Sequence, residues 1–253
     1  MDRKFYSFLG IKVNAFVKED LVTLVDEAVS NNEKYIIGNH NLHSLYLFHH
    51  DKNMQEFYQI ATYIHVDGMS IVWLGKLFGH PLTPKNRLTS LDWLELVLEK
   101  CAKENLRIFS LGSKPGVGEK AANIFRSKFP GLQFKVQHGY FDASKNSMEN
   151  QAILKQIKDY RPHIVMLGMG MPRQEKWIVD NFNEIEANNI WNLGAFMDYY
   201  AREVPTPPRW MGAIGLEWLY RLLSEPKRLW KRYIIEPMFV IKLLFKANIS
   251  RKQ

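Results

Sequence analysis

One loop of this chain combines two glycines, a proline and a run of polar residues directly after an apolar segment. The stretch LGMGMPRQEKWI covers residues 167–178 and contains Gly168, Gly170, Gln174 and Glu175. Glycine lets the backbone approach a ligand closely, and the Gln174 amide can both donate and accept hydrogen bonds. The pattern therefore indicates either a tight turn, with Gln174 and Glu175 capping the next helix, or a loop that holds a ligand.

A second glycine-rich loop lies earlier in the chain. The stretch LGSKPGVGEKAA, residues 111–122, places Gly112, Gly116 and Gly118 between an apolar segment and a helical pattern. The backbone N–H groups of such a loop, together with a helix N-terminus, are typical phosphate ligands. The spacing matches neither G-x-G-x-x-G nor a P-loop. A phosphate site and an ordinary glycine turn therefore both stay open.

A single carboxylate stands out in a third loop. Asp67 follows the apolar segment TYIHV, residues 62–66, and precedes Gly68. A carboxylate at the end of a strand can act as a general base when its surroundings move its pKa away from about 3.9. The alternative is a local Asx turn, which an Asp-Gly pair commonly forms.

Metal and nucleophile chemistries lack their usual patterns. The eight histidines are accompanied by no cysteine cluster and no HExxH motif. The chain contains no Asp-x-Asp and no G-x-S-x-G motif. We therefore expect neither a metal site nor a catalytic serine triad.

Short apolar segments alternate with helical patterns along most of the chain. The expected strands are 34–38, 62–66, 107–112, 132–137, 163–168 and 189–194. Helical spacing is found over 90–105, where Thr89 or Ser90 is the expected N-cap, and again over 117–129 and 150–160. This alternation predicts an α/β fold with a mostly parallel sheet. Such sheets bind ligands at the C-terminal ends of their strands, where the three loops lie.

The C-terminal part has a different character. Three prolines in AREVPTPPRWMG, residues 201–212, interrupt the pattern, so we expect a domain over 1–200 and an appendage over 201–253. Within the appendage, Pro226 and Pro237 are expected to separate about three helical pieces. Residues 202–253 hold 11 Lys/Arg and 4 Asp/Glu, a net of +7 out of the chain's +8. A local basic segment of this kind suggests an anionic partner, such as phosphate, nucleic acid or lipid headgroups.

Composition sets broad limits. The 253 residues are 46% hydrophobic, enough for one large packed domain with an appendage. The single cysteine, Cys101, excludes a disulfide framework and favours a reducing compartment. The N-terminal residues predict no signal peptide, and no apolar run is long enough to predict a membrane-spanning helix.

Six stretches, in order along residues 35–233, resemble the WecG/TagA/CpsF glycosyltransferase family, glycosyltransferase family 26. They are VDGMSIVW, LGSKPGVGEKAA, HGYF, LGMGMPRQEKWI, NLGAFMDYYA and GLEWLYRLLSEPKRLWKRY. The resemblance implies a Rossmann-like core and an appendage that docks on the bacterial inner membrane. It also implies metal-independent, inverting transfer of a sugar from a UDP-sugar to a polyprenyl-diphosphate-linked saccharide. The UDP-sugar is a substrate, so no cofactor is expected.

The resemblance also assigns roles to residues. Asp67 lies where the family's proposed catalytic base lies, and Gln174 matches the glutamine of its Pro-x-Gln-Glu motif. Arg87 matches an arginine that precedes the following helix. The appendage arginines thought to grip the diphosphate match Arg221, Arg228 and Arg232. The expected substrate-binding residues are Asn39, Asn41, Arg87, Gly112, Gly116, Gly168, Gly170, Gln174, Glu175, Asp198, Arg221, Arg228 and Arg232.

Some positions depart from the family pattern. Many members have Thr-x-Asn-x-Glu after the first strand, where this chain has Asn39, Asn41 and His43, and Ser90 replaces a common glycine. These loops are expected to line a sugar, so N-acetylmannosamine, its uronic acid, glucose and glucuronic acid all stay open as donors. Asp198 also follows an expected strand and is the rival base.

The expected partners are a UDP-sugar, the lipid-linked acceptor and the anionic inner face of the cell membrane, with no nucleic acid. The protein is expected to be cytoplasmic and peripheral on that membrane, and a homo-oligomer stays open. One alternative is a dinucleotide-dependent oxidoreductase or epimerase, but the full glycine fingerprint and the acid about 20 residues further on are missing. The other is a non-catalytic membrane or nucleic-acid adaptor, which leaves the ligand-like loops unexplained.

Overall fold

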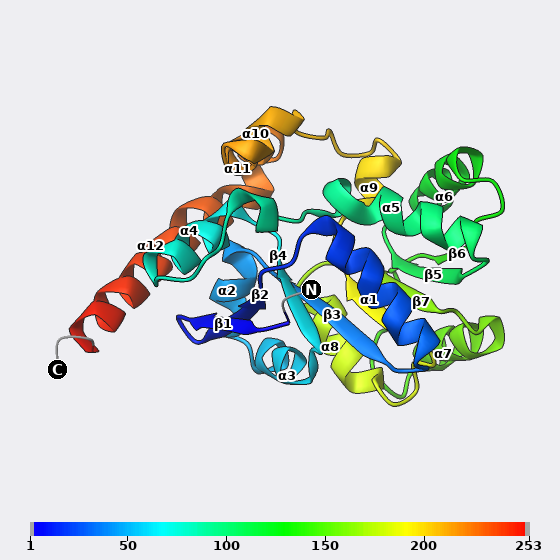
Figure 1. Cartoon of the computed structure of the whole chain (residues 1–253). Coiled ribbons are helices and arrows are strands. Elements are labelled where there is room, and N and C mark those ends of the chain that lie inside the picture. The colour runs from blue at the N-terminus through cyan, green and yellow to red at the C-terminus, as the bar shows by residue number, and fades with distance from the viewer. Residues whose placement is uncertain (1–2, 251–253) are drawn as a thin grey trace.

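The computed structural model describes residues 3–250 and is built around one six-stranded parallel sheet (Figure 1). The strand order is β4-β3-β8-β7-β5-β6. The strands are β3 (Tyr35–His40), β4 (Tyr63–Val66), β5 (Arg107–Gly112), β6 (Gln133–Gln137), β7 (Ile164–Gly168) and β8 (Asn189–Asn192). Each of the six expected strands is present, and the α/β fold class is confirmed.

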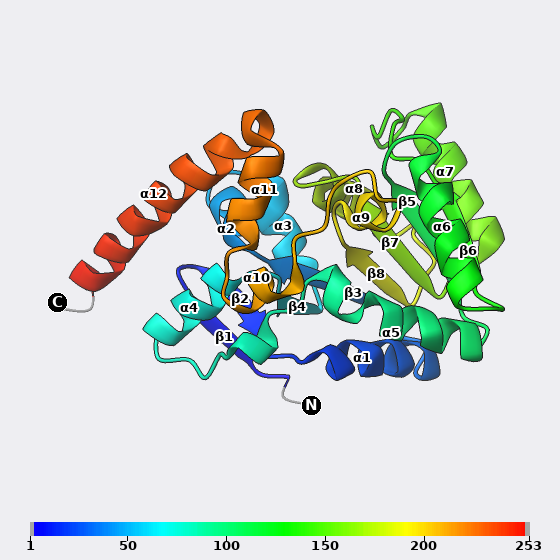
Figure 2. The same ribbon diagram turned by 90° about the horizontal axis from the view of Figure 1, so that it is seen from above.

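Helices cover both faces of this sheet (Figure 2). They are α1 (Lys18–Ser30), α2 (Leu42–Phe48), α3 (Lys52–Ile60), α4 (Met69–Leu77), α5 (Ser90–Lys103), α6 (Val117–Lys128), α7 (Met148–Tyr160), α8 (Arg173–Asn181) and α9 (Phe196–Tyr200). Successive strand residues point to opposite faces. Ile36 therefore packs in the core under α3, α7 and α8, whereas Ile37 packs in the core under α1, α5 and α6.

A hairpin near the N-terminus was not expected from the sequence. Strands β1 (Phe5–Phe8) and β2 (Ile11–Asn14) pair in antiparallel register through Leu9 and Gly10. Both turn residues have positive φ, 49° and 81°, which suits a two-residue hairpin turn. Asn14 attaches the hairpin to the sheet, because its side-chain oxygen accepts a 2.9 Å hydrogen bond from the Ile64 amide.

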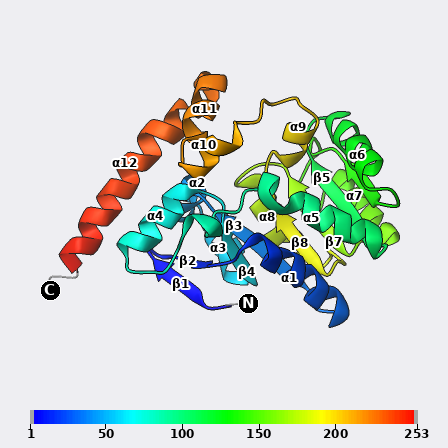
Figure 3. The same ribbon diagram turned by 45° about the horizontal axis from the view of Figure 1, so that its top comes forward.

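The C-terminal segment crosses back over the carboxyl edge of the sheet (Figure 3). It contains α10 (Arg209–Ala213), α11 (Glu217–Ser224) and α12 (Pro226–Ser250). Phe239 of α12 packs against the rings of Tyr46 and His50, at and just beyond the end of α2, with centroid distances of 5.4 and 4.6 Å. Residues 251–253 of the expected appendage lie outside the described residues. Within 3–250, no helix is both long and apolar enough to span a bilayer.

The expected break at Pro237 is wrong, because α12 continues through it. A proline inside a helix removes one hydrogen bond and costs about 3 kcal/mol. Leu229 on the N-terminal side and Val240 on the C-terminal side are both buried, so packing on both sides of Pro237 offsets that cost. Pro226 does mark a boundary: it is the first residue of α12, where a proline loses no helical hydrogen bond.

Candidate active site

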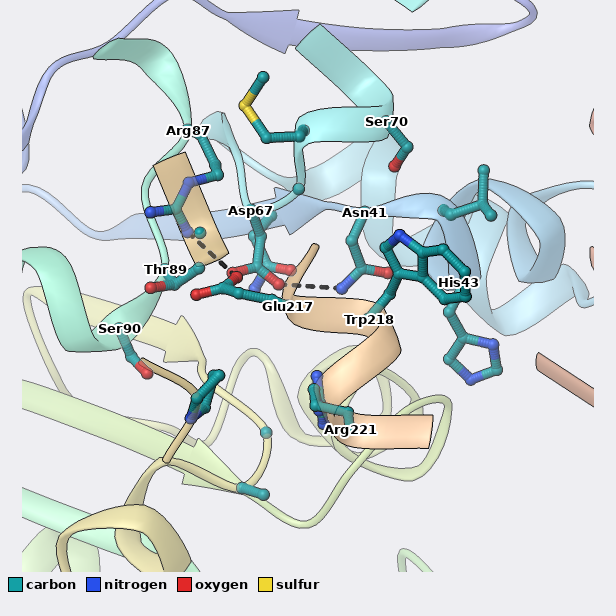
Figure 4. Close-up of a pocket in the computed structure, with 18 of the residues that line it drawn as sticks. Asn41, His43, Asp67, Ser70, Arg87, Thr89, Ser90, Glu217, Trp218 and Arg221 are labelled. Atoms are coloured by element: carbon teal, nitrogen blue, oxygen red, sulfur yellow. Dashed lines mark hydrogen bonds and ion pairs between the residues drawn. The ribbon is translucent and has the colours of Figure 1, made fainter. Parts of the chain in front are cut away.

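A cavity of about 620 Å³ opens at the carboxyl ends of β3, β4, β7 and β8 (Figure 4). Loops of the sheet form its floor, and α10, α11 and α12 form the opposite wall. The lining residues used below are Asn39, Asn41, His43, Asp67, Ser70, Trp73, Arg87, Thr89, Ser90, Gly170, Gly194, Tyr199, Gly212, Glu217, Trp218, Arg221, Arg228, Arg232 and Tyr233. The cavity therefore lies between the strand ends and the basic C-terminal segment.

Asp67 faces this cavity directly after β4. Its backbone N–H donates a 2.8 Å hydrogen bond to the carbonyl of His40, which continues the pairing of β4 with β3. Enclosure by the protein raises the pKa of Asp67 to about 6, against the lowering effect of a hydrogen bond from Asn41. Glu217 raises the pKa further, whereas Arg221 and Arg232 lower it. The carboxylate is thus mainly ionised at neutral pH and is tuned close to the value that suits a general base.

Asn41 holds the carboxylate in place. It is the N-cap of α2, and its side-chain oxygen accepts a 3.0 Å hydrogen bond from the Ser44 amide. Because the oxygen is engaged in the cap, the Nδ2 group points to Asp67 and donates to Oδ2 at 2.9 Å. The same Asn41 oxygen accepts a weak 3.5 Å contact from Nη2 of Arg232 in α12. Asn41 therefore joins the helix cap, the carboxylate and the C-terminal segment.

Arg87 reaches the cavity from the loop that leads to α5. Leu88 donates a 2.7 Å hydrogen bond to the carbonyl of Val66, which anchors this loop beside Asp67. The Arg87 guanidinium lies 3.2 Å from Glu217 and 3.4 Å from Asp92, so two carboxylates neutralise it. Asp92 also caps α5 by accepting a hydrogen bond from the backbone N–H of the N-cap, Thr89, which confirms one of the two expected caps.

The three matched arginines of the C-terminal segment all line the cavity. Arg228 is held by Glu225, with an Nε–Oε1 distance of 2.8 Å. Arg221 and Arg232 make no salt bridge within 4 Å to any described residue, and the buried Nε of Arg221 has no hydrogen-bond partner there. Enclosure and the adjacent Arg221 lower the pKa of Arg232. Two enclosed cations without a carboxylate partner form a place where an anion would be stabilised.

Gln174 and Glu175 are placed differently from the ligand-binding interpretation. Both are fully buried, and neither lines the cavity. The Gln174 side-chain oxygen accepts hydrogen bonds from the backbone N–H groups of Gly170 and Gly194, at 3.2 and 3.3 Å. The Gln174 amide then donates to Glu175 at 2.8 Å. Gln174 joins the two glycine loops that line the cavity, and both ends of its side-chain amide are hydrogen-bonded within the protein.

Glu175 continues this buried network toward β3. Its Oε1 also accepts a 2.7 Å hydrogen bond from Asn192, and the Asn192 carbonyl accepts a 2.6 Å bond from Asn39. Burial raises the pKa of Glu175, and its Oε2 has no partner among the described residues. The network thus connects Asn39, which does line the cavity, to the helix that follows β7.

Four other expected residues lie outside the cavity lining. Gly112 and Gly168 are register partners at the ends of the parallel strands β5 and β7, and a Cβ on Gly112 would lie 2.4 Å from the Gly168 backbone. Gly116 has a φ of 84° and is the N-cap of α6. Asp198 accepts a 2.9 Å hydrogen bond from the Ser113 hydroxyl. The structure therefore brings Asp67, not the rival Asp198, into the cavity with the arginines.

Several lining residues were missed by the sequence reasoning. Glu217, Trp218, Tyr199 and Tyr233 belong to or lie near stretches that carry the resemblance, but nothing in their spacing indicates which side chains face inward. The Nδ1 atom of His43 forms a 2.7 Å hydrogen bond with the buried Glu236 of α12, so the departure at this position is matched by a partner. Among residues 3–250 there is no group of three or more His, Cys, Asp or Glu arranged to hold a metal ion.

The parallel sheet, the carboxylate at its carboxyl edge and the enclosed arginines define an α/β protein with a charged cavity at the carboxyl ends of its strands. The model of the Glycosyl transferase WecG/TagA/CpsF family matches residues 6–253, so the protein belongs to that family. It is a glycosyltransferase, and both the resemblance and the expected class of enzyme are confirmed.

Curated relatives give a more specific comparison. Proteins of Staphylococcus aureus strains MRSA252, MW2 and NCTC 8325 / PS 47 are each 28% identical to this chain over 192 residues. The matched part covers 76% of this chain and 71% of each relative. Each relative is named N-acetylglucosaminyldiphosphoundecaprenol N-acetyl-beta-D-mannosaminyltransferase.

Proposed function

We propose that this protein transfers an N-acetylhexosamine from a UDP-sugar to a saccharide on a polyprenyl diphosphate, with inversion at the anomeric carbon, in the synthesis of a bacterial surface polysaccharide. The observation that carries the proposal is the pairing of one tuned carboxylate with two enclosed arginines in one cavity. The name of the Staphylococcus aureus relatives supports N-acetylmannosamine as the first donor to test.

The proposed reaction is a single displacement. The ionised carboxylate of Asp67 accepts the proton of the acceptor hydroxyl while that oxygen forms a bond to the anomeric carbon. The bond from the anomeric carbon to the UDP oxygen breaks, and its electron pair leaves with the diphosphate. Arg221 and Arg232 stabilise the charge that develops on the leaving group, which is where an enclosed cation contributes most. Asn41 keeps the base oriented throughout.

The two sides of the cavity suit the two substrates. In Figure 4, Arg87, Thr89 and Ser90 lie on one side of Asp67, and Ser70, His43 and Trp218 lie on the other. We assign the first side, which carries the Arg87 guanidinium, to the donor, because a guanidinium suits the diphosphate of a UDP-sugar. The second side, which carries the half-exposed Trp218, is assigned to the lipid-linked acceptor.

The C-terminal segment, 201–253, is proposed to be the appendage that rests on the inner face of the membrane, with 1–200 as the catalytic domain. Helices α11 and α12 expose large apolar side chains next to basic ones. The exposed apolar residues are Trp218, Leu223, Trp230, Ile234, Ile235, Met238, Ile241 and Phe245, and the exposed lysines are Lys227, Lys231, Lys242 and Lys246. This combination favours an anionic lipid surface.

The test is release of UDP from a panel of UDP-sugars, with and without a short-chain prenyl-diphosphate saccharide. The donors in the panel are the UDP derivatives of N-acetylmannosamine, of its uronic acid, of glucose and of glucuronic acid. Acceptor-dependent release from UDP-N-acetylmannosamine, with a product one sugar longer by mass, supports the proposal. Release from a uronic acid or glucose donor alone would refute the N-acetylhexosamine assignment, and silence with all donors would refute the transferase assignment for these substrates.

A further inference from the structure

Glu217 belongs to the C-terminal segment but lies among the residues of the catalytic centre. It is the first residue of α11, where a carboxylate is favoured by the helix N-terminus. Its Oε2 accepts the 3.2 Å ion-pair contact from Arg87, which is 130 positions earlier in the chain. Figure 4 shows the Glu217 carboxylate beside Asp67. A residue outside the sheet domain therefore supplies a second negative charge next to the base.

The Arg87–Glu217 pair is tightly enclosed. The Arg87 side chain is only 10% exposed, so little solvent screens the pair. The backbone of Gly212 in α10 packs against both partners, because a Cβ there would lie 2.8 Å from Oε1 of Glu217 and 2.9 Å from Nη2 of Arg87. On the other side Asp92 contacts the same guanidinium at 3.4 Å. This packing fixes the pair only while α10 and α11 are seated on the sheet domain.

The groups that shift the pKa of Asp67 come from three helices. The α2 N-cap Asn41 contributes an amide, α11 contributes Glu217 and Arg221, and α12 contributes Arg232. Without Glu217, the two arginines and the amide would all favour the ionised form, and the carboxylate would become a weaker base. The same segment that brings the arginines for the leaving group therefore also brings the carboxylate that balances them.

We propose that Glu217 is a positioning residue of the transfer reaction, which fixes Arg87 at the donor side and places a second carboxylate beside Asp67 when the C-terminal segment is seated. The inference rests on the proposed function for its kinetic readout. It adds a residue that neither the motifs nor the family resemblance assigned.

The experiment compares three variants across a pH series. Glu217→Gln keeps the shape and the acceptor oxygen for Arg87 but removes the charge. Glu217→Ala removes both. Glu203→Gln is the matched control, because it removes one charge from the same C-terminal segment at an exposed position paired with Lys120. Thermal melting of each variant shows that the fold is retained.

In Glu217→Gln, the acidic limb of the kcat/KM profile is expected to move to lower pH by roughly 1 unit, the size expected for the loss of one nearby like charge. The KM for the UDP-sugar stays within about twofold in this variant. Glu217→Ala moves the limb in the same direction and also raises the donor KM by about tenfold, because a hydrogen bond that holds a charged group is lost. Glu203→Gln leaves both quantities unchanged.

A second readout does not depend on turnover. The Asp67 carboxyl signal in a ¹³C NMR titration, assigned by its absence in Asp67→Asn, should move to lower pH in Glu217→Gln and stay in place in Glu203→Gln. If the NMR midpoint and the kinetic limb coincide with wild type in Glu217→Gln, the proposal is wrong. Silence of wild type with every donor would instead count against the proposed function, and the titration would still decide the role of Glu217.

Discussion

The contact between Asn41 and Asp67 allows a prediction with a magnitude. Asn41→Asp keeps an N-cap residue at the start of α2 but removes the side-chain amide that donates a hydrogen bond to the Asp67 carboxylate. A hydrogen bond to a charged group contributes about 1.5–3 kcal/mol. Since about 1.4 kcal/mol corresponds to one pH unit, the acidic limb of the activity profile should move upward by about 1–2 units, and further through the added carboxylate.

This shift makes the loss of activity depend on pH. Asp67 starts with a pKa of about 6. For an upward shift of about 1.5 units, the ionised fraction at pH 6.5 falls about eightfold, whereas at pH 8.5 it falls by only about a tenth. The deficit of Asn41→Asp should therefore be large at pH 6.5 and mostly recovered at pH 8.5. This pH dependence can be measured as acceptor-dependent UDP release at saturating donor from pH 5.5 to 9.

The outcome that refutes the reasoning is a deficit of the same size at both pH values. It would mean that Asn41 contributes through substrate contact or through the position of α2, and that its amide does not tune the base. Thermal melting separates a third case, because loss of the helix cap alone costs about 1 kcal/mol and would lower the midpoint of unfolding. Retention of the wild-type melting midpoint with a moved acidic limb supports the tuning role.

Three further predictions use the same geometry. Asp67→Asn should lower transfer by at least about 100-fold, the usual contribution of a general base, while calorimetry still detects UDP binding; near wild-type turnover would remove Asp67 from the mechanism. Glu175→Gln tests the buried network: because burial raises the pKa of Glu175, wild-type stability contributed by this group falls as pH rises above the ordinary glutamate value of about 4.3. The melting difference should therefore shift in favour of Glu175→Gln between pH 5 and pH 8, and a constant difference would contradict this. Trp218→Ala should raise the KM for a polyprenyl-linked acceptor by about tenfold through lost apolar contact and leave a lipid-free diphosphate saccharide unaffected, with the exposed Trp210→Ala outside the cavity as the control.

The sheet could be predicted because its strands are buried on both faces. Such strands read as continuous apolar runs ended by glycine or a polar residue, as in HIVMLG before the loop at Gly168. The hairpin of β1 and β2 is not evident from the sequence because its strands, FYSF and IKVN, mix polar and apolar residues and so do not read as continuous apolar runs. The break expected at Pro237 is absent because the low helix propensity of proline is offset by the buried packing of α12 on both sides of it.

The site was predictable only in its local parts. Asp67 directly follows the apolar strand β4, and Arg87 precedes the amphipathic helix α5. Both residues line the cavity. The inward orientation of Glu217 depends on how α11 lies across the sheet, and no local pattern contains that information. Gln174 shows the opposite case: its place in a glycine-rich loop suggests a ligand contact, but its two backbone partners, Gly170 and Gly194, lie in the loops that follow β7 and β8.

Helices α11 and α12 carry inward arginines and outward apolar side chains on one continuous piece of structure. If the outward side chains rest on a bilayer, as we propose, the helices fix the height of Asp67 above the lipid headgroups. An acceptor anchored in that bilayer presents its terminal hydroxyl at a height set by the number of sugars it already bears. Under that proposal, an acceptor that has gained a sugar would present its terminal hydroxyl above Asp67, so the height of the base would select acceptors by their length.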